Sequence, residues 1–257
     1  SKKIITHSGN FHADDVFACA VLSLFYKGAI EIVRSRDPKV WETADVMVDV
    51  GGIYDESLDR FDHHQEGGAG ARDNGVLYAS CGLVWKKLGE KLSGGAYTAK
   101  IIDERLVQPI DAGDNGTSLY HKQGEVIPYL IHDAIGAFRP GWKESHTSDE
   151  GFFEAFAVAK KILEREIILS SEEEEGRRLA EEAYARAGDK RIIVLDGYYP
   201  WHTVLRASPE PIFVVKPERY NPGKWKVEAI RDDTSSFKNR KNLPSSWAGK
   251  IDTELAS

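Results

Sequence analysis

The sequence predicts an α/β fold with a parallel-sheet N-terminal domain, a long helical connector and a smaller α/β C-terminal domain. Short apolar runs alternate with helical segments through the first half of the chain, which favours a sheet built from crossover connections. A single helical pattern begins at Asp149, and strand-like runs return after Gly188. We therefore divide the 257 residues into domains at 1–148 and 190–257, joined by a connector at 149–189.

Local spacing predicts the elements of the N-terminal domain. Three apolar runs are predicted strands, and a fourth candidate precedes a histidine pair: residues 2–6, 30–34, 46–50 and 57–61. Three segments carry apolar residues at helical spacing: residues 11–26, 78–92 and 96–106. The last of these helices is expected to end before Pro109, which leaves Asp111 in a loop.

The connector and the C-terminal domain differ in the spacing of their apolar residues. The connector carries an apolar stripe that predicts one long amphipathic helix. The stripe consists of Phe152, Phe156, Ala159, Leu163 and Ile167. Beyond it, residues 191–195, 212–216 and 224–230 have strand character, and the last run alternates apolar and polar residues.

Composition limits the partners of the chain. Hydrophobic residues make up 41% and charged residues 29%, which is typical of a globular protein. A net charge of −7 excludes a sequence-wide basic surface for non-specific nucleic-acid binding, although divalent metal and a local basic patch could still receive a phosphate. No run of about 18 apolar residues occurs, so no membrane partner is expected.

The two cysteines, Cys19 and Cys81, lie in apolar stretches and are predicted to be reduced core residues. This usage is typical of a cytoplasmic chain, and we expect that location. The sequence carries no information about a targeting segment before Ser1.

Histidines and aspartates gather near the ends of the predicted strands. The set comprises His7, His12, Asp14, Asp15, Asp49, Asp62, His63 and His64. Ligands of open α/β sheets bind at the carboxyl ends of the strands, and a buried charge there is costly unless it is paired or binds a cation. The sequence therefore predicts that these side chains meet at one sheet edge. For each group alone, a purely structural His–Asp contact is the alternative.

Mixed imidazole and carboxylate ligands suit manganese, zinc, iron or cobalt better than calcium. No cysteine accompanies the cluster, which argues against a structural zinc site. The number of candidate ligands exceeds the need of one ion. Two ions about 3.5–4 Å apart, bridged by a carboxylate, would use them all.

Five motifs follow one another in a recognisable order: residues 7–15 (HSGNFHADD), 49–52 (DVGG), 61–65 (FDHHQ), 111–116 (DAGDNG) and 236–244 (SFKNRKNLP). Together they resemble the DHH phosphoesterase superfamily and, more narrowly, the MYG family of melanocyte-proliferating-gene type exonucleases. The resemblance covers nearly the whole chain. It implies a DHH-type N-terminal catalytic domain with two divalent metal ions, commonly manganese, and a substrate-binding C-terminal domain.

The resemblance also implies roles for single residues. The implied metal ligands are His7, His12, Asp14, Asp49, His63 and Asp111, with Asp15 and Asp114 as alternates. Asp49 would bridge the ions, and the implied catalytic residues are His64, Asp49 and Asp62, of which His64 would contact the phosphate. The superfamily usually has aspartate where this chain has His12, which leaves zinc, cobalt, iron and magnesium open as alternatives to manganese.

Basic residues suggest where the substrate binds. Arg72 follows the histidine pair on a glycine-rich loop and could reach a phosphate. Lys238, Arg240 and Lys241 form a basic cluster beside Phe237, and such a cluster suits a nucleotide phosphate and base. A solvated surface arginine and a solvated basic turn are the respective alternatives.

The predicted function is that of a metal-dependent phosphodiester hydrolase, a 3′–5′ exonuclease acting on RNA or short oligonucleotides. A small-nucleotide phosphatase or pyrophosphatase is the second hypothesis, and a non-catalytic metal- or nucleotide-binding protein is the third. A metal-dependent peptide hydrolase lacks support because no His-Glu-x-x-His motif occurs. Nucleic acid or an oligonucleotide is the expected partner, and homodimer formation is left open.

Overall fold

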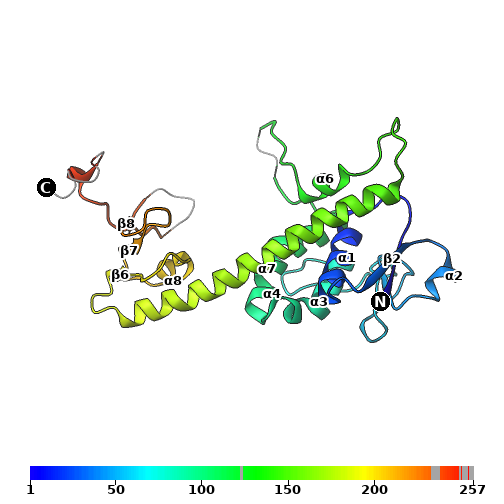
Figure 1. Cartoon of the computed structure of the whole chain (residues 1–257), viewed down its shortest axis with the longest axis horizontal. Coiled ribbons are helices and arrows are strands. Elements are labelled where there is room, and N and C mark those ends of the chain that lie inside the picture. The colour runs from blue at the N-terminus through cyan, green and yellow to red at the C-terminus, as the bar shows by residue number, and fades with distance from the viewer. Residues whose placement is uncertain (122–123, 233–237, 249, 251–253, 255–257) are drawn as a thin grey trace. The chain divides into compact units, whose positions relative to one another are not determined.

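The computed structural model describes residues 1–121, 124–232, 238–248, 250 and 254. The chain forms two compact units, Ser1–Ser171 and Glu172–Ser257. Each unit has a sheet and an apolar core of its own. The structure thus has the α/β architecture that the sequence predicts (Figure 1).

A five-stranded sheet forms the base of the N-terminal unit, with strand order β2–β1–β3–β5–β4. The strands are β1 (Lys2–Thr6), β2 (Ile30–Arg34), β3 (Val46–Val48), β4 (Tyr54–Asp55) and β5 (Arg60–Phe61). Neighbouring strands pair in parallel except at the edge, where β4 is antiparallel to β5. The fourth predicted strand is correct only at its end, because Glu56–Leu58 form a 3₁₀ turn capped by Asp55.

Successive residues of each strand face opposite sides of this sheet, as the pleat requires. On one side Ile4, Val46, Val48 and Phe61 belong to the main core with helices α1 (Ala13–Phe25) and α3 (Ser80–Ser93). On the other side Ile5 and Met47 pack near the short helix α2 (Pro38–Trp41). Cys19 and Cys81 are both free and buried in the main core, as predicted.

The segment around Asp111 differs from the prediction. Helix α4 (Ala96–Ile102) continues through a π turn (Asp103–Val107) into helix α5 (Gln108–Asp114). The expectation that Pro109 ends the helix and leaves Asp111 in a loop is wrong. Pro109 follows directly after the π turn, where the regular i→i−4 hydrogen-bond pattern is already interrupted, so the helix continues past it and Asp111 lies on a helix and is fully buried.

The predicted connector is one long helix, α7 (Ser148–Arg186). Phe152, Ala159 and Leu163 of its apolar stripe are buried in the main core, and Phe156 and Ile167 pack against that core, as predicted. Further along α7, alanines contribute to the core of the second unit. The two compact units divide this helix after residue 171, whereas the sequence treats it as a separate connector.

The second unit contains a three-stranded sheet with the order β6–β7–β8. Its strands are β6 (Ile192–Val194), β7 (Phe213–Pro217) and β8 (Trp225–Ala229). The β6–β7 pair is parallel and the β7–β8 pair is antiparallel. Helix α8 (His202–Ala207) adds Leu205 to the core, which confirms a smaller α/β unit.

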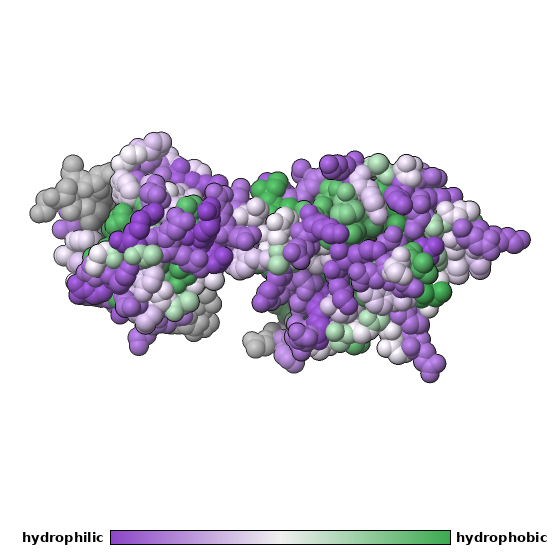
Figure 2. All heavy atoms as spheres, turned by 90° about the horizontal axis from the view of Figure 1, so that it is seen from below, coloured by the Kyte–Doolittle hydropathy of each residue, from purple (hydrophilic) through white to green (hydrophobic). Residues whose placement is uncertain are grey.

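Hydrophilic residues predominate on the face shown in Figure 2, with separate apolar patches between them. Among the described residues, no helix combines the length and the apolarity that a membrane span requires.

Two short helices that the sequence analysis did not foresee, α2 and α6 (Ile131–Gly136), complete the N-terminal unit. Both lie near the site described next.

The packing of α7 predicts a difference between two neighbouring phenylalanines. Phe152 is fully buried, whereas Phe153 is 44% exposed. Phe152→Ala should lower the free energy of unfolding by about 3–5 kcal/mol because it leaves a cavity in the main core. Phe153→Ala, the matched control, should have a much smaller effect. Urea unfolding followed by circular dichroism measures both, and equal losses would contradict this packing.

Candidate metal centre

The loop between β1 and α1 carries the first pair of histidines. His7 directly follows β1, is buried, and has its Nδ1 3.3 Å from the carbonyl oxygen of Ser8. His12 is the N-cap of α1, and its backbone N–H donates to Asp15 Oδ1 at 2.7 Å. This capping contact fixes the first helical turn and leaves Asp15 Oδ2 3.4 Å from His7 Nε2.

Asp49 follows β3 in the left-handed conformation, with φ of 54°. Aspartate is one of the few residues that tolerate this region, and Gly51 continues the turn with another positive φ. On the next strand, β5, the Asp62-His63-His64 triplet follows Phe61. Because β1, β3 and β5 are parallel neighbours, their carboxyl ends meet at one sheet edge. The predicted gathering of these side chains is therefore confirmed.

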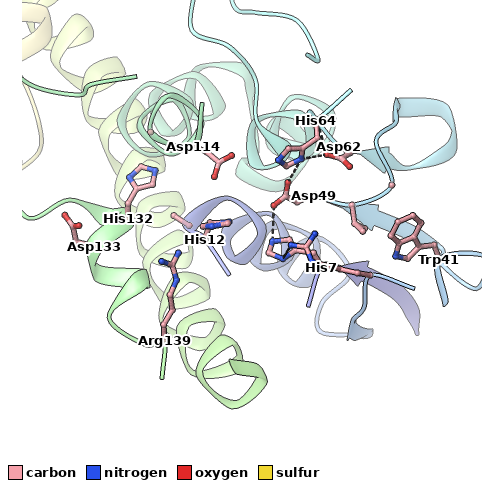
Figure 3. Close-up of a pocket in the computed structure, with 15 residues that line it drawn as sticks. His7, His12, Trp41, Asp49, Asp62, His64, Asp114, His132, Asp133 and Arg139 are labelled. Carbon is pink, nitrogen blue, oxygen red and sulfur yellow. Dashed lines mark hydrogen bonds and ion pairs between the residues drawn. The ribbon is translucent and has the colours of Figure 1, made fainter. Parts of the chain in front are cut away.

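Three overlapping groups of potential ligand atoms lie at this edge, and within each group the atoms are at most 4.8 Å apart. The groups are His7, His12, Asp15 and Asp49; Asp49, His63 and His64; and Asp14, His63 and Asp114. Asp49 Oδ2 lies 3.2 Å from His7 Nε2, while its Oδ1 lies 3.4 Å from His63 Nε2. Asp49 thus occupies the centre of the site (Figure 3).

The buried ligand atoms test whether these residues fit a metal ion. In the part of the chain that the structure describes, four of them make no regular hydrogen bond and instead face a neighbouring carboxylate or imidazole at 3.1–3.4 Å: His7 Nε2, Asp15 Oδ2, Asp49 Oδ1 and His63 Nε2. Leaving a buried polar atom without a good hydrogen bond costs about 1–3 kcal/mol. Imidazole and carboxylate lone pairs suit a divalent transition metal, and a ligand histidine commonly directs its second nitrogen to a backbone carbonyl, as His7 does. The residues present therefore fit a metal ion.

Proximity and burial shift the pKa values of the cluster. Burial alone would lower the pKa of His63, but the close carboxylates of Asp114 and Asp49 raise it to about 11. The close carboxylate of Asp49 raises the pKa of His64 to about 9, against the opposing effect of burial. Burial would raise the pKa of Asp49, yet its histidine neighbours hold it well below the ordinary range. Without a cation, the cluster therefore balances its carboxylates with protonated imidazoles.

Asp14 and Asp111 both accept hydrogen bonds from the first turn of α3. The Asp14 carboxylate accepts from the N–H groups of Ser80 and Cys81 at 3.1 and 2.6 Å, and Asp111 Oδ1 accepts from Gly82 at 2.9 Å. These N–H groups have no intrahelical partner, and the helix N-terminus favours negative charge. A Cβ at Gly82 would lie 1.8 Å from Asp111 Oδ2, so the close approach requires glycine.

The structure separates the roles of Asp111 and Asp114. Asp111 belongs to none of the three ligand groups, and its Oδ2 lies 2.8 Å from Arg72 Nη1. Asp114, named above as an alternate, has its Oδ2 3.1 Å from His63 Nε2. The ligand role of Asp111 stays a prediction, while the geometry brings Asp114 to the side of His63.

Arg72 is buried rather than directed toward the ligand groups. It donates from Nε and Nη2 to Asp103 at 2.9 and 2.7 Å, and its guanidinium lies over the Tyr78 ring. Because Nη1 also contacts Asp111, the guanidinium forms ion pairs with two carboxylates, those of Asp103 and Asp111. The structure therefore places Arg72 in a buried ion-pair network, and its predicted contact with substrate stays a prediction.

The second predicted substrate cluster lies in the C-terminal unit. Arg240 pairs with Asp232 and donates to the backbone carbonyls of Ser208 and Pro211. Lys238 and Lys241 are exposed, and Phe237 lies outside the described residues. Arg240 thus anchors its segment within the unit, and substrate binding by these three basic residues stays a prediction.

A cavity of about 740 Å³ opens beside the ligand groups. Five of its polar or aromatic lining residues were missed from the sequence: Arg36, Trp41, His132, Asp133 and Arg139. Trp41 lies on one side of Asp49 in Figure 3, and His132 and Arg139 lie on the other. Arg36 comes shortly after β2, so a search for polar residues at strand ends could have found it. His132 lies on α6 and Arg139 comes shortly after that helix, and neither position follows a strand.

The fold and the site define an α/β protein with a candidate metal centre at the carboxyl edge of a parallel sheet. A family model named MYG1_exonuc, described as "Uncharacterised protein family (UPF0160)", matches residues 3–257. The chain is 31% identical over 282 residues to a MYG1 protein of Schizosaccharomyces pombe, covering 99% of this chain and 86% of that protein. It is 30% identical over 291 residues to the MYG1 exonuclease of Homo sapiens, covering 98% and 76% respectively.

A similar relation holds to the MYG1 exonuclease of Bos taurus, with 31% identity over 288 residues that cover 98% of this chain and 75% of that protein. The chain belongs to the MYG1 family. No solved structure matches it significantly.

The buried network of Arg72 predicts a strong effect on stability. Arg72→Ala should lower the free energy of unfolding by about 3–5 kcal/mol, because Asp111 would lose its cationic partner while it stays buried. Arg191 is the matched control: it contacts Asp189 through the same Nε and Nη2 donors, but its side chain is 70% exposed. Arg191→Ala should leave urea unfolding unchanged. A similar midpoint for both variants would refute a structural role for Arg72.

The raised pKa values predict how divalent-metal affinity depends on pH. The proton on His63, whose pKa is about 11, competes with the ion. Affinity should therefore rise between pH 6 and pH 9, by about tenfold per pH unit for this proton. Titration calorimetry with Mn²⁺ in buffers of different ionisation enthalpy measures both the affinity and the proton release. Affinity independent of pH, without proton release, would contradict this electrostatic balance.

Proposed function

We propose that this chain is a metal-dependent phosphodiester hydrolase that removes nucleotides from the 3′ end of RNA or short oligonucleotides through a two-metal site. The observation that carries the proposal is the set of buried imidazole and carboxylate atoms that face one another around Asp49 without regular hydrogen bonds. Relatives named MYG1 exonuclease, at about 30% identity over nearly the whole chain, support the class of reaction.

The ligand groups support two ion positions that share Asp49. His7, His12, Asp15 and Asp49 would hold one ion, and the residues around His63, including Asp14 and Asp114, would hold the other together with Asp49. The mixed ligands favour manganese, with zinc, cobalt, iron and magnesium as alternatives. Bound divalent ions would supply Lewis acidity toward a phosphoryl oxygen and lower the pKa of water at neutral pH.

His64 is the side chain best placed to contact the phosphate. Its ring is 62% exposed and lines the cavity, and its Nδ1 lies 2.8 Å from Asp62 Oδ1 and 3.2 Å from Asp49 Oδ1. The two carboxylates occupy Nδ1, so Nε2 remains for the substrate. The protonated ring would donate from Nε2 to a phosphoryl oxygen on which negative charge develops.

Asp62 would act by positioning its neighbours. Its Oδ1 also accepts from the backbone N–H of His64 at 3.1 Å, and its Oδ2 accepts from the N–H of Gly52 at 2.6 Å. One carboxylate thereby joins the turn after β3 to the histidine pair after β5. This contact would hold the His64 ring in place while a substrate enters and leaves.

The central test compares cleavage of single-stranded RNA by the manganese-loaded protein and its variants. His64→Ala should slow cleavage about 10²–10³-fold, as expected for the loss of one charge-stabilising donor. Asp49→Ala should abolish cleavage and metal binding together, because two of the three ligand groups contain Asp49. His121→Ala alters an exposed histidine outside the cavity and serves as the control. Normal cleavage by both site variants would sink the proposal.

The substrate panel separates the exonuclease from its alternatives. A 5′-labelled RNA should shorten stepwise from its 3′ end, faster than pyrophosphate or a mononucleotide is hydrolysed. Faster hydrolysis of pyrophosphate would indicate a small-nucleotide enzyme instead. Metal binding without turnover of any of these substrates would indicate a binding protein.

A further inference from the structure

Two arginines approach the ligand groups from the wall of the cavity. Arg36 and Arg139 line the same cavity as His64, and Arg36 Nη2 lies 3.2 Å from His7 Nδ1. In Figure 3 His12 lies between Arg139 and His7, so the two guanidinium groups reach the site at different places. Both belong to the unit that carries the ligand groups.

The loop between β1 and α1 orients both guanidinium groups. Arg36 Nε donates to the carbonyl oxygen of Ser8 at 3.0 Å, and Arg139 Nε donates to that of Phe11 at 2.7 Å. Arg139 Nη2 also donates to Phe11. A planar guanidinium fixed through Nε presents its remaining N–H groups in a defined direction, which reduces the entropy lost on binding an anion.

Both arginines keep donors for a ligand. Across the described residues, Nη1 of neither side chain makes a hydrogen bond, and neither guanidinium pairs with a carboxylate. The arginines singled out from the sequence differ in this respect, because Arg72 and Arg240 are fully engaged within their own units. Oriented guanidinium groups that make no direct ion pair with a carboxylate favour an anionic ligand that offers oxygens to their remaining N–H groups.

Building on the proposed function, we propose that Arg36 and Arg139 bind two separate phosphates of the substrate strand: the phosphate that is cleaved and its neighbour along the strand. Cation contacts at two places suit a polynucleotide backbone better than a single phosphate. The substrate class that follows is an oligonucleotide with at least two phosphodiester linkages. Substrate recognition would then begin in the N-terminal unit itself.

Binding of fluorescent single-stranded oligonucleotides to the metal-loaded protein, measured by anisotropy, tests these contacts. Phosphorothioate linkages in the oligonucleotides slow cleavage during the measurement. For a hexanucleotide, Arg36→Gln and Arg139→Gln should each weaken binding about tenfold. Each should also reduce the slope of log K against log salt by about 0.7, the value for one phosphate contact with a single strand. Lys39→Gln removes the same charge from an exposed neighbour outside the cavity and should change neither quantity.

A substrate modification identifies the contact itself. A hexanucleotide with one neutral methylphosphonate at the linkage next to the 3′-terminal one should bind the wild-type chain about tenfold more weakly. One of the two arginine variants should show no additional loss with this ligand, since the same contact is already gone, while the other should show the full loss. A dinucleotide, with a single phosphate, should depend on one arginine only.

Controls separate phosphate binding from an effect on the loop. The Gln variants should keep the wild-type metal stoichiometry and melting temperature. If either variant unfolds, Arg36→Lys and Arg139→Lys, which keep the charge, take its place in the methylphosphonate comparison. Losses that simply add to that of the methylphosphonate in both variants would overturn the inference.

Other outcomes distinguish the inference from the proposed function. If the wild type binds and cleaves RNA but neither arginine affects the affinity or the salt slope, the inference fails and the exonuclease proposal stands. Arginine-dependent binding without cleavage under any divalent metal supports the inference and refutes the hydrolase. Absence of oligonucleotide binding by the wild type overturns both.

Discussion

Asp49 brings a carboxylate to the middle of a buried sheet edge, where its two oxygens face the imidazoles of His7, His63 and His64. Two features of the chain place it there. The parallel pairing of β3 between β1 and β5 aligns three strand ends, and the left-handed backbone at Asp49 turns the chain immediately after the strand. Such a cluster is stable only with protons or a cation among its carboxylates, so charge balance constrains the fold as much as apolar packing does.

The sequence predicts the sheet edge well because strands and their ends depend on local patterns. Short apolar runs place β1, β2 and β3 nearly at their observed bounds, and residues after β1 and β3 belong to the ligand groups. The π turn before α5 could not be predicted, because sequence rules expect a helix to end before a proline, whereas here the helical run continues through Pro109. Without that helix, the sequence could not decide whether Asp111 or Asp114 faces His63.

Arginines illustrate a second limit of prediction. A guanidinium near a motif is chemically suited to phosphate, yet the partner that it meets depends on carboxylates far away in the chain. Arg72 forms ion pairs with Asp103 and Asp111 and therefore has a structural role. Arg36 and Arg139 instead contact backbone carbonyls, and Arg36 also contacts the ring of His7. Arg34 is a third case: it holds the Gly9 carbonyl but is balanced by Asp149 at the start of α7. The same residue type thus serves as clamp or as binding group, according to the acids that tertiary structure supplies.

The contact between Asp15 and the first turn of α1 has a thermodynamic consequence. One oxygen of this carboxylate caps the helix through the His12 N–H, and the other faces His7 Nε2. A proton or cation bound at Asp15 Oδ2 changes the electron density on Oδ1, which caps the helix. Helix capping and occupancy of the site are therefore linked. By reciprocity, the free energy by which occupancy changes capping equals the free energy by which capping changes binding at the site. The N-terminus of α1 therefore reports on the occupancy of the site. Hydrogen exchange of the first amides of α1 should change when the neighbouring site is filled, without any label in the site itself.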